Sequence, residues 1–290
     1  MAEDLEVFDT QFCSLGEGII WHPLRNSVIW FDILEQKMFE KASKSSEKKV
    51  FDFDLPISAA GIINESEMLV ATSRALEQFN LTTKTRNKVV DLEATSGKTR
   101  SNDGRADPYG GFWIGTMGMH LEKDVGSYYR YYKGELRKIY DNITVPNATC
   151  FSTCGEVAYF SDTAKNKIWS VALDKNGWPK GEPKTFLDFT REKLLPDGAV
   201  IDMQGNLWNA QWGSSRVACY DPTGKLIEEV LIPASQVSCL CIGGDEMSTL
   251  FVTSAREGLG EEKLLETPLT GMTFTKKFNY PGQLEHRVVL

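Results

Sequence analysis

The sequence has few cysteines, only three histidines and no excess of basic residues. Its 290 residues include 32 Lys and Arg against 40 Asp and Glu, which gives a formal net charge of −8 and a pI near 5.1. This balance argues against binding to nucleic acid or to an anionic membrane, because either partner needs a basic surface. No apolar run approaches the ~20 residues that span a bilayer. The acidic N-terminus also lacks the apolar segment of a signal peptide, so we expect a soluble, cytoplasmic protein.

Several signatures of catalytic or disulfide-rich proteins are also missing. Six cysteines are too sparse for a disulfide framework and none forms a Cys-x-x-Cys pair, so we expect them to be small buried residues. No Gly-x-Ser-x-Gly motif supplies the nucleophile of a serine hydrolase. No long stretch has helical periodicity, and residues 258–266 are expected to be a loop or a single turn.

What the sequence has instead is a repeat of short apolar, β-prone runs. Each run follows a polar or glycine-containing turn, as in a hairpin, and successive runs start 40 to 50 residues apart: Val28–Asp32, Met68–Thr72, Phe112–Thr116, Val157–Asp162, Leu207–Gln211 and Leu250–Ser254. A unit of this length with about four strands is typical of a β-propeller blade. A β-sandwich would not repeat at this period, and the coils of a β-helix are shorter.

We therefore predict an all-β fold, a six-bladed β-propeller with about four antiparallel strands per blade, in which residues 1–290 form one domain. The segment Leu5–Asp9 is expected to supply a strand to the last blade. The tryptophans on predicted strands are expected to lie in the core between blades: Trp30, Trp113, Trp169, Trp208 and Trp212. A propeller has no long exposed sheet edge that requires a partner, so we expect a monomer.

Polar residues recur at the first strand of several blades, and that strand lines the central channel of a propeller. The first blade offers Glu17, the fourth Asn147 and the fifth Asp197. Two neighbouring carboxylates repel each other unless a proton or cation lies between them, and an all-oxygen set suits a divalent ion such as Ca²⁺, Mg²⁺ or Mn²⁺. Three protein ligands leave room for water and substrate. Each residue alone fits ordinary turn chemistry, but the three matching positions favour a metal site.

Five linked motifs resemble those of the senescence marker protein/regucalcin/gluconolactonase family. They occur in the family's order and spacing over residues 14 to 290: Gly16-Glu-Gly18 with Trp21, Asn102-Asp-Gly104 with Phe112–Met117, Pro146-Asn147 with Ser152, Tyr159–Asp162, and Pro196-Asp-Gly198 with Asp202 and Gly205–Trp208. The resemblance implies a six-bladed propeller that hydrolyses a sugar lactone, an aldonolactone, with one divalent metal ion: Ca²⁺, Zn²⁺, Mn²⁺, Mg²⁺ or Fe²⁺.

The resemblance also implies roles for individual residues. Glu17, Asn147 and Asp197 match the metal ligands, Arg100 and Asn102 match the substrate contacts, and Asp197 matches the expected proton acceptor.

Two departures from the family pattern concern the same site. Ala148 follows Asn147 where the family usually has glycine, so we expect a differently shaped loop, since alanine disfavours a left-handed backbone. After Gly115-Thr-Met117, mammalian relatives carry acidic residues that help to bind the sugar. Here the sequence continues Gly118-Met-His120, which makes His120 a candidate substitute contact.

Two other functions stay open. The chain could be a calcium-binding regulatory propeller without turnover, although such a protein would not need Arg100 and Asn102. It could also be a metal-dependent hydrolase of aryl esters or organophosphates, whose sites are more apolar and hold calcium with more ligands. Of the remaining candidates, His22 is expected to be structural and His286 exposed. The cluster Tyr128–Tyr132 is either an outer strand or a lid beside the channel.

Overall fold

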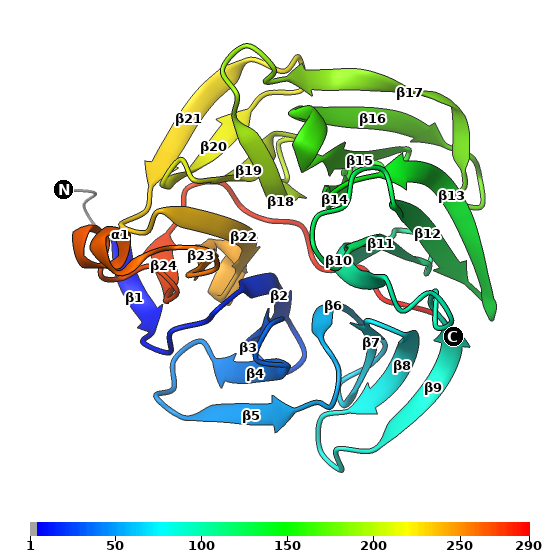
Figure 1. The fold of residues 1–290 in the computed structure, drawn as a ribbon, viewed down its shortest axis with the longest axis horizontal. Coiled ribbons are helices and arrows are strands. Elements are labelled where there is room, and N and C mark those ends of the chain that lie inside the picture. Colours follow the sequence, from blue (N-terminus) through cyan, green and yellow to red (C-terminus); the bar gives the residue numbers. More distant parts are fainter. Residues whose placement is uncertain (1–4) are drawn as a thin grey trace.

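The computed structural model describes residues 5–290 and contains six four-stranded antiparallel sheets arranged as a ring (Figure 1). This confirms the predicted six-bladed β-propeller. Within the described residues, no helix is long and apolar enough to cross a membrane. All six cysteines are free and five are buried, but Cys154 is exposed, contrary to expectation.

In each of the first five blades, four strands follow one another in the chain from the channel to the rim. The first two blades contain β2 (Gly16–His22), β3 (Ser27–Asp32), β4 (Lys37–Ala42), β5 (Lys48–Asp52), β6 (Ile57–Ile62), β7 (Glu67–Thr72), β8 (Ala75–Asn80) and β9 (Arg86–Asp91). The next two contain β10 (Thr99–Ala106), β11 (Phe112–Gly118), β12 (Gly126–Tyr132), β13 (Glu135–Ile143), β14 (Pro146–Phe151), β15 (Val157–Asp162), β16 (Lys167–Leu173) and β17 (Pro179–Asp188). The fifth contains β18 (Leu195–Ile201), β19 (Leu207–Trp212), β20 (Arg216–Tyr220) and β21 (Leu226–Leu231).

The sixth blade joins the two ends of the ring. Its sheet has the order β1-β24-β23-β22, made from β1 (Leu5–Asp9), β22 (Gln236–Gly243), β23 (Thr249–Ala255) and β24 (Thr273–Lys277). The N-terminal segment therefore supplies the outer strand, as predicted. Asp9 at the end of β1 forms ion pairs with Lys41 at 3.2 Å and Lys48 at 2.6 Å, which hold the closing strand to the first blade. The short helix α1 (Glu261–Glu266) lies between β23 and β24.

The C-terminal tail, residues 278–290, crosses the middle of the ring (Figure 1, red). The side chain of Gln283 donates hydrogen bonds to the carbonyls of Phe151 and Ile201, in the fourth and fifth blades, at 3.2 and 3.0 Å. Further on, the backbone of Val288 donates to Ile62 in the second blade at 2.7 Å. His286 on this tail is half-buried, so the expected exposure was wrong.

Large aromatic side chains fill the space between blades. Trp30, Trp113 and Trp208 are fully buried, as predicted, whereas Trp169 and Trp212 are only partly buried. Tyr128–Tyr132 lies in β12, the third of four strands in its blade, so it is not a lid, and the outermost strand is β13 instead.

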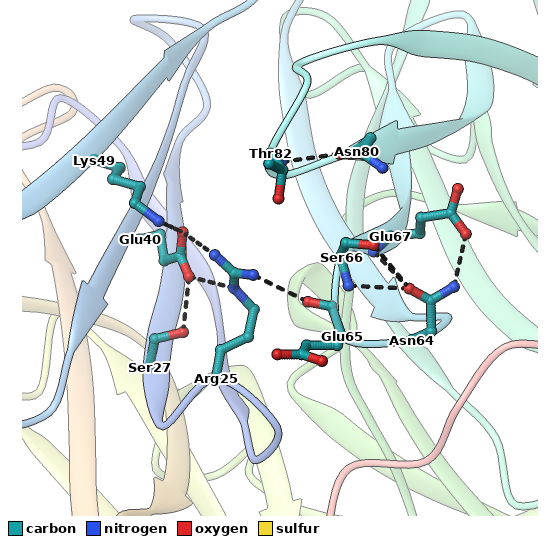
Figure 2. Close-up of polar contacts among 10 residues, drawn as sticks. All are labelled: Arg25, Ser27, Glu40, Lys49, Asn64, Glu65, Ser66, Glu67, Asn80 and Thr82. Carbon is teal, nitrogen blue, oxygen red and sulfur yellow. Dashed lines mark hydrogen bonds and ion pairs between the residues drawn. The ribbon is translucent and has the colours of Figure 1, made fainter.

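Polar contacts connect the turn between β2 and β3 of the first blade to the turn between β6 and β7 of the second (Figure 2). Arg25 binds both carboxylate oxygens of Glu40 within the first blade, through Nε and Nη2, and its Nη1 donates to the carbonyl of Glu65 in the second at 3.2 Å. Lys49 and Ser27 also contact Glu40, each at 3.2 Å. Because it lies among these donors, Glu40 has a lowered pKa, even though burial acts to raise it.

Candidate functional site

A β-bulge interrupts the first strand of every described blade. The register against the second strand shifts within β2, β10, β14, β18 and β22 at matching places, and in β6 nearby. Bulges re-aim side chains and occur often beside active sites. Glu17 and Asn147 are the last paired residues before their bulges, whereas Asn102 and Asp197 lie one position further on, inside theirs. All four line one cavity, but Asp197 is offset by one position from the equivalent place that the sequence pattern predicted.

The backbone directly after Asn147 is left-handed. Ala148 has a φ of 58°, the left-handed conformation, and Gly18 at the matching point of the first blade also has a φ of 58°. The loop therefore keeps the conformation that glycine favours, and the expected difference in shape is not found. Alanine in this conformation costs on the order of 1 kcal/mol.

A cavity of about 320 Å³ opens at one end of the channel. Five of the six predicted site residues line it: Glu17, Arg100, Asn102, Asn147 and Asp197. The remaining lining residues are mostly apolar, with three further polar side chains: Leu15, Met117, Leu121, Thr144, Val145, Thr163, Ala164, Leu195, Trp212 and Glu257.

His120, the sixth predicted residue, is not among those that line the cavity. It is exposed on the loop after β11, where its backbone N–H donates to the carboxylate of Glu122 at 2.9 Å. The neighbouring Leu121 lines the cavity instead. A substrate contact by His120 stays a prediction.

A chain of hydrogen bonds links three blades below the cavity. Nη1 of Arg100 donates to Oδ1 of Asn102 at 2.8 Å, and Nδ2 of Asn102 donates to Oδ1 of Asn147 at 3.0 Å. Nδ2 of Asn147 then donates to Oγ1 of Thr163 at 2.9 Å, and that hydroxyl donates to the carbonyl of Pro196 at 2.6 Å. These hydrogen bonds fix which side of the Asn147 amide carries the oxygen. The series ends at Pro196, the residue before Asp197.

Burial dominates the electrostatics of the two carboxylates. It raises the pKa of Glu17 to about 8, with a further contribution from the negative charge of Asp103. It also raises the pKa of Asp197 well above its ordinary value, and repulsion from Glu17 and Asp103 adds to the shift. Burial lowers the pKa of Arg100, which the carboxylates of Glu257, Glu17 and Asp197 oppose. A cation in this cavity would relieve the repulsion between the carboxylates.

The donor set fits a divalent metal ion. Oδ1 of Asp197 is buried and has no hydrogen-bond partner among residues 5–290, so one oxygen lacks the stabilisation that a buried acceptor needs. Across the described part of the chain, no group of three or more His, Cys, Asp or Glu side chains could hold a metal. The proposed set of Glu17, Asp197 and Asn147 is not a group of this kind, because Asn147 contributes an amide oxygen. Glu17, Asn147 and Asp197 could together hold a hard or versatile cation through oxygen.

Three residues of the site were not found in the sequence. Thr163 and Trp212 lie at or just after the end of a second strand, and Glu257 lies two residues past one, whereas the search followed first strands. Trp212 was assigned to the core between blades, but it is partly exposed and lines the cavity. The sequence did contain a common signal, because all three residues lie at the end of a second strand or within two residues after it.

Residues 15–256 match the family model described as the SMP-30/Gluconolactonase/LRE-like region. The crystal structure of a calcium-binding protein, regucalcin, from Agrobacterium tumefaciens is 36% identical, with a TM-score of 0.96 over 98% of this chain and 97% of that one. The 6-deoxy-6-sulfogluconolactonase of Pseudomonas putida is 27% identical over 98% of both chains. The L-arabinolactonase of Azospirillum brasilense is 29% identical over 94% of this chain and 92% of the relative.

Proposed function

The chain belongs to the SMP-30/gluconolactonase/LRE-like family, and from that premise we propose that it hydrolyses a sugar lactone to the aldonic acid with one divalent metal ion. The observation that supports this most directly is the convergence of five predicted residues from four blades on one cavity. Two relatives that match nearly all of the chain are named lactonases.

Glu17, Asn147 and Asp197 would hold the metal ion. When bound, such an ion supplies a Lewis acid for the lactone carbonyl and for the charge that develops on its oxygen. Calcium is named for the Agrobacterium relative, and for this chain the identity of the ion is open among Ca²⁺, Zn²⁺, Mn²⁺, Mg²⁺ and Fe²⁺.

Asp197 is proposed to activate the attacking water. In its ionised form the Asp197 carboxylate accepts a proton from the water, whose oxygen forms the new bond to the carbonyl carbon. The bond between that carbon and the ring oxygen then breaks. The ring oxygen receives the proton, so one lactone and one water give one hydroxy acid, and no covalent enzyme intermediate is needed.

Arg100 and Asn102 are proposed to act on the substrate in different ways. Nε and Nη2 of Arg100 donate to no residue that the structure describes, so this edge of the guanidinium is available to lactone oxygens. Asn102 already uses Nδ2 to bind the carbonyl of Pro146 and the side chain of Asn147, each at 3.0 Å. It therefore orients the amide of Asn147 and reaches substrate only through Oδ1.

A calcium-binding protein without turnover is the second candidate, favoured by the name of the Agrobacterium relative. The free donors of Arg100 argue for a substrate beside the ion. Cytoplasmic location and a monomeric state stay predictions, which fractionation and light scattering would check.

The test is a proton-release assay on a panel of aldonolactones. The protein is stripped with a chelator and each of the five divalent ions is restored singly. Metal-dependent turnover of a sugar lactone above the spontaneous rate is expected. Metal binding without turnover would favour the calcium-binding role. Faster turnover of aryl esters than of lactones would favour a hydrolase of aryl esters or organophosphates. If none of the restored ions binds, the assigned ligands are wrong.

A further inference from the structure

We propose that Glu257 is a specificity-determining residue, whose carboxylate accepts hydrogen bonds from hydroxyl groups of the substrate at the mouth of the cavity. The inference rests on the proposed lactone hydrolysis and adds a residue that the predicted site does not contain. It comes from the sixth blade, where the first strand offers almost no polar group to the channel.

The first argument is position. Glu257 lines the same cavity as Glu17, Arg100 and Asp197, although its own side chain is exposed at the surface. Three carboxylates oppose the lowering of the Arg100 pKa through their negative charges, and Glu257 has the largest effect of the three. Glu257 and the cation that is proposed to bind lactone oxygens therefore line one cavity.

The second argument is that the segment is held in place. Nε2 of the buried Gln236 donates to the backbone carbonyls of Ala255 and Glu257 at 3.0 and 2.9 Å. Between them, Arg256 donates from its backbone to Ser14 at 3.1 Å and from Nε to Thr270 at 2.8 Å. A fixed backbone lets a side chain bind substrate without first paying to order the segment.

The third argument is chemical complementarity. No hydrogen-bond donor among residues 5–290 contacts the Glu257 carboxylate, which accepts only, while the free edge of Arg100 donates only. A hydroxyl group both donates and accepts, so a polyhydroxylated ring can satisfy both side chains. Trp212, partly exposed on the same wall, adds an aromatic surface for the C–H face of such a ring.

Glu257 supplies an acidic group to the cavity from the sixth blade. The expected consequence is a preference for hydroxylated lactones that depends on Glu257.

The test compares lactones with and without hydroxyl-bearing substituents. Wild type, Glu257→Ala and Glu257→Gln are assayed on D-glucono-1,5-lactone and on δ-valerolactone, the same six-membered lactone ring without the hydroxyl and hydroxymethyl groups. The matched control is Glu261→Ala, an exposed acidic residue of α1 outside the cavity. Binding of D-glucono-1,5-lactam, which is neutral and resists hydrolysis, is measured in parallel by calorimetry.

For Glu257→Ala we expect about a tenfold loss of kcat/KM on the hydroxylated lactone, carried by KM, and about a tenfold weaker lactam affinity. The unsubstituted lactone and metal affinity should change less than about twofold, and Glu257→Gln should be intermediate.

Equal losses on both lactones, a loss of metal affinity, or no change at all would overturn the inference, as would a wild type that does not bind the lactam. If the wild type hydrolyses neither lactone, the proposed function fails, while lactam binding still decides the role of Glu257.

Discussion

Replacing Thr163 with valine should weaken metal binding and turnover without unfolding the protein. The substitution keeps the shape of the side chain and removes one hydroxyl, which accepts from Nδ2 of Asn147 at 2.9 Å and donates to the carbonyl of Pro196 at 2.6 Å. Asn147 is 3% exposed, so water cannot easily replace the lost partner.

The magnitude follows from the group left unpaired. A buried donor without a partner costs about 1 to 3 kcal/mol, and the Asn147 amide would relieve this cost by rotating away from the orientation that presents Oδ1 to the proposed ion. Loss of a partner that orients a ligand typically reduces metal affinity or activity by about 10 to 100-fold. We expect about a tenfold weaker Mn²⁺ or Ca²⁺ affinity and a comparable loss of lactone turnover.

The assay is metal titration by calorimetry beside a proton-release assay, with thermal unfolding as the check on folding. Thr163→Ser is the matched control, because it keeps the hydroxyl and removes only a methyl group, and it should retain most of both activities. Equal losses in the valine and serine variants, or a valine variant with full metal affinity, would refute the idea that Thr163 orients Asn147.

Three further predictions concern the base, the substrate cation and a buried histidine. Asp197→Asn should reduce turnover by about 10² to 10⁴-fold with no loss of thermal stability, since it relieves repulsion with Glu17; an active variant would exclude Asp197 as the base. Arg100→Ala should raise KM by about tenfold or more and leave metal affinity unchanged, and a parallel loss of metal in calorimetry would contradict the division of roles. Burial lowers the pKa of His22 to about 4 from 6.5, so the folded state keeps the ring neutral while the unfolded chain takes up a proton. His22 should therefore contribute full stability above pH 6.5 and lose about 2 kcal/mol of it between pH 7 and 5. In urea unfolding at both pH values, the free energy of unfolding of the wild type should fall by about 2 kcal/mol more than that of His22→Gln. An equal pH dependence in the two proteins would refute this.

The blade count and three candidate ligands could be predicted from sequence because both depend on local patterns. Strands alternate with a period of two and turns need particular residues, so six hairpins at a regular spacing identify six blades. Glu17, Asn147 and Asp197 lie in the first strands of three blades, and a ring brings first strands together around the channel. Closure by Leu5–Asp9 followed from the missing outer strand of the last blade.

The tertiary structure decided what the repeat does not encode. Ala148 adopts a left-handed backbone against its intrinsic preference, at the register position where Gly18 does the same in the first blade. Residues 278–290 belong to no blade, and their path depends on hydrogen bonds to backbone carbonyls of five blades. Thr163, Trp212 and Glu257 reach the cavity from the ends of second strands. Repeat position alone determined which residues face the axis, whereas strand tilt and the packing of neighbouring blades decided which others lie within contact distance of it.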